Sequence, residues 1–187
     1  MTTELHPLGF FLPENTRLLM LGSFPPPKAR WSMDFYYPNI QNDMWRILGL
    51  IFYGNKDAFL RDKKAFSEEK AKAFCREKGI GIGDTAMEVI RLKANASDKF
   101  LEVVRPIDPE KVLSQIPECV AIVVTGQKAM DTLLSVLPGT EEPKVGFSSE
   151  FSCMGRTMMP SSSRAYPRPL EEKAAIYRGM FETLGMV

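Results

Sequence analysis

Short apolar runs alternate with longer segments of helical periodicity, and this alternation constrains the fold of the chain more than any other feature. The four runs span residues 17–22, 79–86, 120–124 and 157–159. The first, RLLMLG, is continuous and apolar and ends in Gly and Ser, as a buried parallel strand should. Because strands that alternate with helices form a parallel sheet covered on both faces, we expect an α/β fold.

Five segments around these runs carry apolar residues at helical spacing. The first begins at Asn42 or Asp43, either of which could cap it. A charged helix over 67–78 is predicted to end at Gly79, the residue type preferred after a helix C-terminus. A third starts at 108–109 in the favoured order of cap and then Pro, and a fourth follows the third strand. The fifth has an apolar stripe at Leu170, Ala174, Tyr177, Phe181 and Leu184.

The length and charge of the chain limit its organisation and its partners. A length of 187 residues suits one domain with a sizeable core, so we expect a single domain over 1–187. The net charge is only +1, which provides no global basic field. A nucleic-acid partner would therefore have to be held by a local positive patch.

Metal centres and membrane insertion are not expected. The cysteines Cys75, Cys119 and Cys153 are far apart and form no CxxC motif, and the chain has a single histidine, His6. A zinc or iron–sulfur site is therefore improbable on composition. We find no stretch of about 20 apolar residues and no basic leader, so we predict no membrane span and no signal peptide. Reduced thiols favour a cytoplasmic protein.

Three predicted strands are followed by unusual residues, in the sequences GSFPPP, GDTA and MPSSSRA. Since ligands of open parallel sheets bind at the carboxyl ends of the strands, we expect these loops to converge into one site. Taken singly, each candidate residue also has a plain explanation as a stiff turn, core aromatic, helix cap or polar loop. These residues are Pro25, Pro26, Pro27, Tyr36, Tyr37, Asn42, Asp84, Ser161, Ser162 and Ser163.

Taken together, the motifs resemble the hypoxanthine-DNA glycosylase branch of the uracil-DNA glycosylase superfamily. That branch has a pattern similar to L-G-S-x-P-G, then Y-Y, then an Asn two residues before a Trp that follows an apolar residue. Later segments, GIGIGDTA, ASDKFL, VVTGQKAM and MPSSSRA, resemble the branch in the same order, so the resemblance spans nearly the whole chain. In the first motif the matching residues, with one extra residue between Asn and Trp, are Leu21, Gly22, Ser23, Pro25, Tyr36, Tyr37, Asn42 and Trp45.

The resemblance implies a three-layer α/β/α sandwich with a four-stranded parallel sheet. It also implies a monofunctional DNA glycosylase that hydrolyses the N-glycosidic bond of a flipped deaminated base, hypoxanthine or uracil, in base-excision repair. Such hydrolysis needs no cofactor, and the partner would be DNA that contains a damaged base. We expect the chain to act as a monomer.

Site roles follow from this chemistry. Asn42 could orient a water and hydrogen-bond a base edge, and Asp84 is its rival as a water-activating carboxylate. A flipped base must be held, and Tyr36 or Tyr37 could stack on it. The base pocket would be formed by Gly22, Ser23, Phe24, Pro25, Tyr36 and Tyr37. The DNA strand would be gripped by Ser161, Ser162, Ser163 and Arg164, with Lys28, Arg30 and Arg168 as a positive rim.

The sequence departs from the family pattern at three positions. Pro26 replaces a glycine, which removes one backbone N–H near the base pocket. Arg164 replaces a proline, and Met159 stands where other branches have a His or Asn that stabilises the departing base. The last departure fits the hypoxanthine branch.

Two other functions remain open. One is a non-catalytic α/β module that binds a nucleotide or a protein, which the near-neutral charge, the missing His and Pro26 favour. It predicts that the three strand-end loops do not form one cleft with Asn42 facing it. The other is a small-molecule hydrolase, which lacks support because the sequence has no G-x-S-x-G elbow and no usable catalytic His.

Overall fold

The computed structural model describes the backbone of residues 2–93, 98–149, 151–153, 156–162 and 168–187, and the side chains of these residues except 151–162. Within it, a central sheet has the strand order β5-β2-β8-β10-β9. The strands are β2 (Leu18–Gly22), β5 (Ile80–Asp84), β8 (Ala121–Val124), β9 (Phe151–Cys153) and β10 (Arg156–Ser162).

The pairing of these strands confirms the expected parallel sheet in part. β2 pairs in parallel with β5 on one side and with β8 on the other, and β8 pairs in parallel with β10. β9 pairs antiparallel with β10 and adds an edge strand to the sheet. The sheet is therefore mixed and has five strands, whereas four parallel strands were expected.

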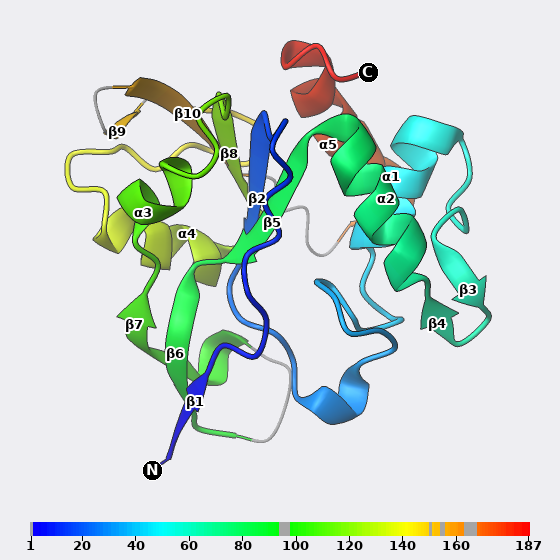
Figure 1. Cartoon of the computed structure of the whole chain (residues 1–187), viewed down its shortest axis with the longest axis horizontal. Coiled ribbons are helices and arrows are strands. Elements are labelled where there is room, and N and C mark those ends of the chain that lie inside the picture. The colour runs from blue at the N-terminus through cyan, green and yellow to red at the C-terminus, as the bar shows by residue number, and fades with distance from the viewer. Residues whose placement is uncertain (1, 94–97, 150, 154–155, 163–167) are drawn as a thin grey trace.

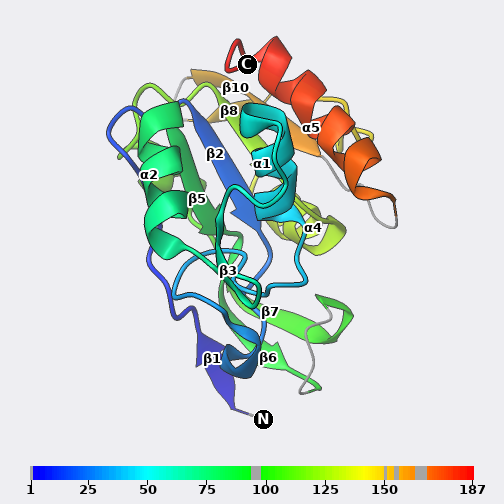
Figure 2. The same ribbon diagram turned by 90° about the vertical axis from the view of Figure 1, so that its right-hand side faces the viewer.

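Helices cover both faces of the sheet, as the sequence predicted (Figures 1 and 2). One face packs against α1 (Met44–Tyr53), α2 (Glu68–Lys78) and α5 (Leu170–Thr183), and the other against α3 (Pro109–Leu113) and α4 (Gln127–Ser135). Alternate residues of each strand divide between the two layers: Leu18 and Met20 join the first core, Leu19 and Leu21 the second. Strands buried on both faces explain the uninterrupted apolar runs.

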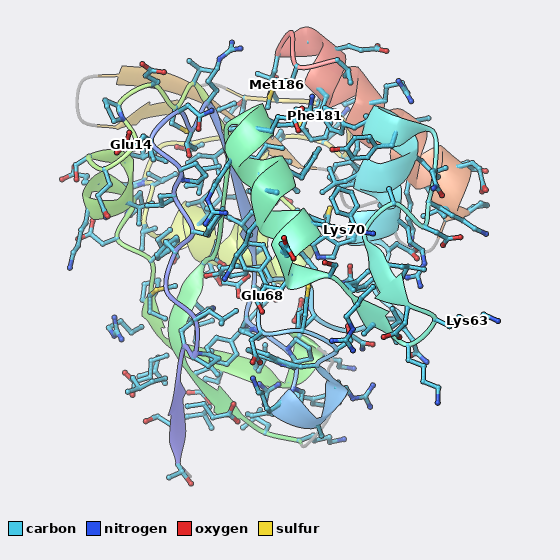
Figure 3. All side chains as sticks on the ribbon, turned by 45° about the vertical axis from the view of Figure 1, so that its right-hand side comes forward. Glu14, Lys63, Glu68, Lys70, Phe181 and Met186 are labelled. Carbon is cyan, nitrogen blue, oxygen red and sulfur yellow. The ribbon has the colours of Figure 1, made fainter. Side chains whose placement is uncertain are left out.

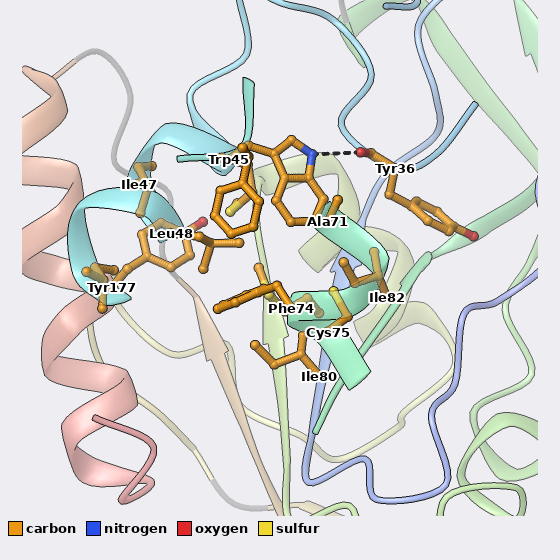
Figure 4. Close-up of a cluster of buried hydrophobic side chains, with 14 of the residues drawn as sticks. Tyr36, Trp45, Ile47, Leu48, Ala71, Phe74, Cys75, Ile80, Ile82 and Tyr177 are labelled. Carbon is orange, nitrogen blue, oxygen red and sulfur yellow. Dashed lines mark hydrogen bonds between the residues drawn. The ribbon is translucent and has the colours of Figure 1, made fainter. Parts of the chain in front are cut away.

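Trp45 of α1 lies fully buried in the larger core, between the sheet and its covering helices (Figure 4). Its indole Nε1–H donates to the carbonyl oxygen of Tyr36 over 3.0 Å. The ring also stacks on Phe35, with ring centroids 6.0 Å apart. These contacts attach the aromatic loop before α1 to the core, so the position of Tyr36 is set by core packing.

Helix ends follow the residues that predicted them. Ser67 caps α2 by accepting from the Lys70 N–H, and Gly79 ends that helix with φ of 67°. A Cβ at Gly79 would lie 2.5 Å from the Asn15 carbonyl oxygen, so glycine is required there for space as well as for conformation. Asp108 caps α3 in the same way, through the Lys111 N–H.

A second, antiparallel sheet extends beyond the carboxyl end of β5 and was not predicted. It has the order β1-β6-β7, formed by β1 (Thr3–Leu5), β6 (Ala86–Arg91) and β7 (Leu101–Pro106). Thr85 alone separates β5 from β6, so one extended segment serves both sheets. The N-terminal segment lies along β6, because β1 pairs with β6 and the His6 N–H donates to the Met87 carbonyl.

Short elements complete the structure. The hairpin of β3 (Leu60–Asp62) and β4 (Ala65–Phe66) precedes α2, and two 3-10 turns are η1 (Lys28–Arg30) and η2 (Asp98–Phe100). Lys63, in the turn of the hairpin, projects outward, whereas Phe181 of α5 is fully buried (Figure 3). Across the described residues, no helix is both long and apolar enough to cross a membrane.

Candidate active site

A cavity of about 350 Å³ opens at the carboxyl ends of β2, β5 and β8. This is where open parallel sheets bind ligands, because the strand ends and the loops that follow them leave a crevice. All eight residues proposed for catalysis and base binding line it, together with others that were not singled out. The lining residues are Leu8, Gly22, Ser23, Phe24, Pro25, Pro26, Tyr36, Tyr37, Pro38, Asn39, Gln41, Asn42, Asp84, Asp98, Thr125 and Gly126.

The floor of the cavity depends on a close approach between β2 and β5. Gly22 lies opposite Asp84 in the parallel register. A Cβ on Gly22 would lie 2.5 Å from Asp84 Oδ1 and 3.7 Å from the Tyr37 hydroxyl. The absence of a side chain at Gly22 therefore makes room for the Asp84 carboxylate and brings the Tyr37 hydroxyl close to it.

Two tyrosines form an aromatic wall that is held by its hydroxyl groups. The Tyr36 hydroxyl donates to the Gly9 carbonyl over 3.1 Å, and the Tyr37 hydroxyl bonds Thr125 Oγ1 at the same distance. Burial raises the pKa of both phenols, and the negative charge of Asp84 raises it further. Both rings therefore stay neutral over the physiological range.

Tyr37 also has an unusual backbone conformation. Its φ is 51°, in the left-handed region, and it is the one non-glycine residue of the described chain with positive φ. Such a conformation costs a residue with a side chain about 1–2 kcal/mol. The Tyr37–Thr125 bond and the packing of the loop on Trp45 hold the ring in place against this cost.

Asn42 is exposed at the rim of the cavity, just before α1. Its Oδ1 accepts from the Met44 N–H over 2.8 Å, so the predicted capping contact exists, although Asp43 occupies the N-cap position itself. One lone pair of Oδ1 and both amide hydrogens remain for a ligand, since the described residues offer the Asn42 amide no partner. Capping and ligand contact are compatible at this residue.

Asp84 has a partner that the sequence did not reveal. His6 Nε2 lies 2.8 Å from Asp84 Oδ2, and the two side chains are only 5% and 8% exposed. The imidazole ring packs edge-on against Phe24 and near Tyr36, with centroid distances of 5.2 and 6.0 Å. The lone histidine, near the N-terminus, was expected to have no catalytic use, and 78 residues separate it from Asp84. No local pattern reports such a contact.

A second carboxylate, that of Asp98, shares the cavity and was not predicted to be a site residue. Ser23 Oγ donates to Asp98 Oδ1 over 2.8 Å. Burial raises the pKa of Asp98 and the charge of Asp84 adds to this effect, whereas the Ser23 hydrogen bond opposes it. Ser23 was predicted to contact the base, and in the structure it also orients this carboxyl group.

Pro26 lines the cavity at the position where the family pattern has glycine. It offers no backbone N–H, and its carbonyl oxygen accepts from Trp31 Nε1 over 2.8 Å. Of the predicted positive rim, Lys28 pairs with Asp34, and Arg168 lies 3.5 Å from Glu172. These two cations are therefore partly neutralised.

The predicted DNA grip lies mostly outside the described residues. Ser161 and Ser162 belong to β10, opposite Val123 and Val124 of β8, which places their backbone at the same edge of the sheet as the cavity. Their side chains, and the whole of Ser163 and Arg164, are outside the described part of the chain. The strand predicted over 157–159 is confirmed as the longer β10.

Metal and thiol chemistry find little support in the part of the chain that the structure describes. Among those residues, no group of three or more His, Cys, Asp or Glu side chains could hold a metal ion. Cys75 and Cys119 are both buried, and burial raises the pKa of Cys75 to about 12. The Cys75 thiol is thus neutral and unreactive.

Comparisons with known proteins bear on the fold. No protein-family model matches the sequence, and no curated protein matches it. Among solved structures, the chain is similar to the solution NMR structure of a candidate uracil DNA glycosylase from Methanosarcina acetivorans, with a TM-score of 0.58 and 24% sequence identity. The match covers 91% of this chain and 94% of that one. The two chains share a fold over most of their length.

Proposed function

We propose that this chain is a monofunctional DNA glycosylase that hydrolyses the N-glycosidic bond of a deaminated base, hypoxanthine or uracil. The observation that carries the proposal is the cavity itself, with an aromatic wall, a free amide and a buried carboxylate at the strand ends of the sheet. Its volume of about 350 Å³ is at the small end of ligand sites and suits one base with part of its sugar. The shared fold with the candidate uracil DNA glycosylase supports the same conclusion.

The chemistry would proceed on a base flipped out of the duplex, because the glycosidic bond cannot be reached inside the stack. Tyr36 and Tyr37, fixed by their hydroxyl contacts, would hold the base. Bond breaking places positive charge on the sugar and negative charge on the base. The Asp84 carboxylate is suited to stabilise the positive charge on the sugar. The Asn42 amide is suited to stabilise the negative charge on the base, or to bond a base edge.

A duplex panel tests the proposal. Duplexes that each contain one hypoxanthine, uracil or alkylated base are incubated with the protein, and abasic sites are scored by alkaline cleavage. We expect release of hypoxanthine or uracil and no strand cleavage before alkali. If no base in the panel is released while the protein is folded, the enzyme proposal fails.

The binding-module alternative makes a different prediction for the same panel. It required that the strand-end loops not share one cleft with Asn42. The loops after β2 and β5 do share a cavity with Asn42, joined by Thr125 and Gly126 after β8. A protein that binds modified duplexes or free nucleotides without excising any base would favour the alternative.

A further inference from the structure

The side chain of His6 is buried beside the cavity, and it contacts the lining residue Asp84 directly. The ring is fixed from several directions. Its backbone N–H donates to the Met87 carbonyl of β6. The imidazole ring packs edge-on against Phe24 and at a tilt beside Tyr36. A histidine fixed this closely against a carboxylate can control the orientation of that carboxylate.

The other ring nitrogen of His6 has a contact for each protonation state. Nδ1 lies 3.1 Å from the Leu8 N–H and 2.6 Å from the Leu8 carbonyl oxygen. In the neutral ring, Nδ1 accepts from the Leu8 N–H and Nε2–H donates to Asp84. In the charged ring, Nδ1–H donates to the Leu8 carbonyl and the Asp84 contact is unchanged. The imidazole can therefore take up a proton without leaving Asp84.

The two oxygens of Asp84 have different surroundings. Oδ2 is taken by His6, whereas Oδ1 lies against Gly22 at the floor of the cavity. Among the described residues, no donor bonds Oδ1. One oxygen is thus fixed and the other is presented to whatever occupies the cavity.

Other titratable groups face this pair. Asp98 and the hydroxyls of Tyr36 and Tyr37 lie close enough to Asp84 for its charge to raise their pKa values. On the N-terminal segment itself, Glu4 pairs with Arg91 of β6 at 3.0 Å. Glu88 of β6 faces away, toward Arg105 at 3.7 Å. His6 is the group among these that contacts Asp84 directly.

We propose that His6 is a positioning residue for the proposed excision reaction: it holds Asp84 Oδ2, so that Oδ1 is directed toward the cavity and can accept a proton from the attacking water. In that step the bond from C1′ to the base nitrogen breaks, and both electrons go to the base. The water oxygen bonds C1′, its proton passes to Asp84 and then to solvent, and the base takes a proton from solvent. This inference rests on the proposed function.

Three variants test the assignment by single-turnover excision across a pH series, with thermal melting as a check of folding. His6→Ala should lower the rate roughly a hundredfold, the usual effect of misplacing a catalytic group by about 1 Å. His6→Gln keeps an N–H that can donate to Oδ2, so it should recover most of that loss. Glu4→Gln, on the same segment, is the matched control and should keep the parental rate and profile.

The results separate positioning from structural support. If His6→Ala keeps the parental rate, if His6→Gln recovers none of the loss, or if Glu4→Gln loses as much rate as His6→Ala, the assignment is wrong. Nitrogen NMR of the one imidazole provides a readout without activity: we expect an Nε2–H tautomer that is lost in Asp84→Ala, and an Nδ1–H tautomer would overturn the contact. Should the parental protein excise no base at all, the proposed function fails and the positioning role with it, while the NMR result still decides the His6–Asp84 bond.

Discussion

Gly22 is the residue at which the site leaves least room for change, because the Asp84 carboxylate occupies the space of its missing side chain. Gly22→Ala would place a methyl group 2.5 Å from Asp84 Oδ1 and displace the carboxylate from His6. We expect a loss of about 1–3 kcal/mol of stability, as for overpacking elsewhere, and a strongly reduced excision rate. Gly9→Ala is the control, since a Cβ there meets nothing within 4 Å. Equal melting temperatures and rates for the two variants would contradict this account.

Asn42 allows capping and catalysis to be separated by substitution. Asn42→Asp keeps an oxygen that can accept from the Met44 N–H but replaces the amide donor by an acceptor-only carboxylate. If the amide acts on the base or water, this variant should stay folded and lose roughly a hundred- to a thousandfold in rate, or change its base preference. Asn42→Ala should in addition lose about 1 kcal/mol of stability with the hydrogen bond. Parental excision of every tested base by Asn42→Asp would transfer the role to Asp84 or to an unassigned residue.

Asp98 should make stability depend on pH in a defined direction. Its pKa is raised in the folded state, mainly by burial, so its protonated form is favoured by folding. The contribution of protonated Asp98 to the stability of the fold is fully present at acidic pH. It is lost as the pH rises through the pKa of the folded state. Asp98→Asn keeps an acceptor for Ser23 and cannot ionise. The variant should therefore gain stability over the parental protein at pH 7, and this gain should be smaller at pH 4. Melting temperatures of the two proteins, measured in parallel at both pH values, test this. The opposite order would show that Asp98 is held as a carboxylate.

At the scale of elements, the segment that follows β10 in the sequence carries the predicted contact with DNA phosphates. Arg164, which lies outside the described residues, should pair with a phosphate and release counterions on binding. Arg164→Ala should weaken duplex binding and reduce the slope of log affinity against log salt by about 1. Arg168→Ala serves as a comparison, since Arg168 already faces Glu172. An unchanged slope for Arg164→Ala would show that the side chain points elsewhere.

The elements that local sequence predicted are those whose signals are local. β2, β5, β8 and the ends of α2 and α3 follow from apolar runs, caps and a C-terminal glycine within their own segments. The strands β1, β6 and β7 were missed because they pair at the edge of the molecule, with only Ala86 and Val89 of β6 buried. Their pairing depends on distant partners rather than on a pattern within 86–91.

At the scale of the whole molecule, the proposed reaction should not depend on a metal. The described residues provide no cluster of metal ligands, and the cavity has carboxylates and an amide suited to direct hydrolysis. We expect the excision rate to be the same with and without excess EDTA, measured on the best duplex of the panel. Activity lost with chelator and restored by zinc would contradict a cofactor-free mechanism.

The sequence by itself located the parallel strands of the central sheet and the five described helices, because periodicity and capping act within a few residues. It also located the loops after β2 and β5, whose residues line the cavity. Only the tertiary structure decided that an N-terminal segment lies along β6 and brings His6 to Asp84, and that η2 brings Asp98 to Ser23. These contacts join residues 78 and 75 positions apart. They are set by how the sheets and loops pack together, and patterns within a few residues of sequence cannot predict that packing.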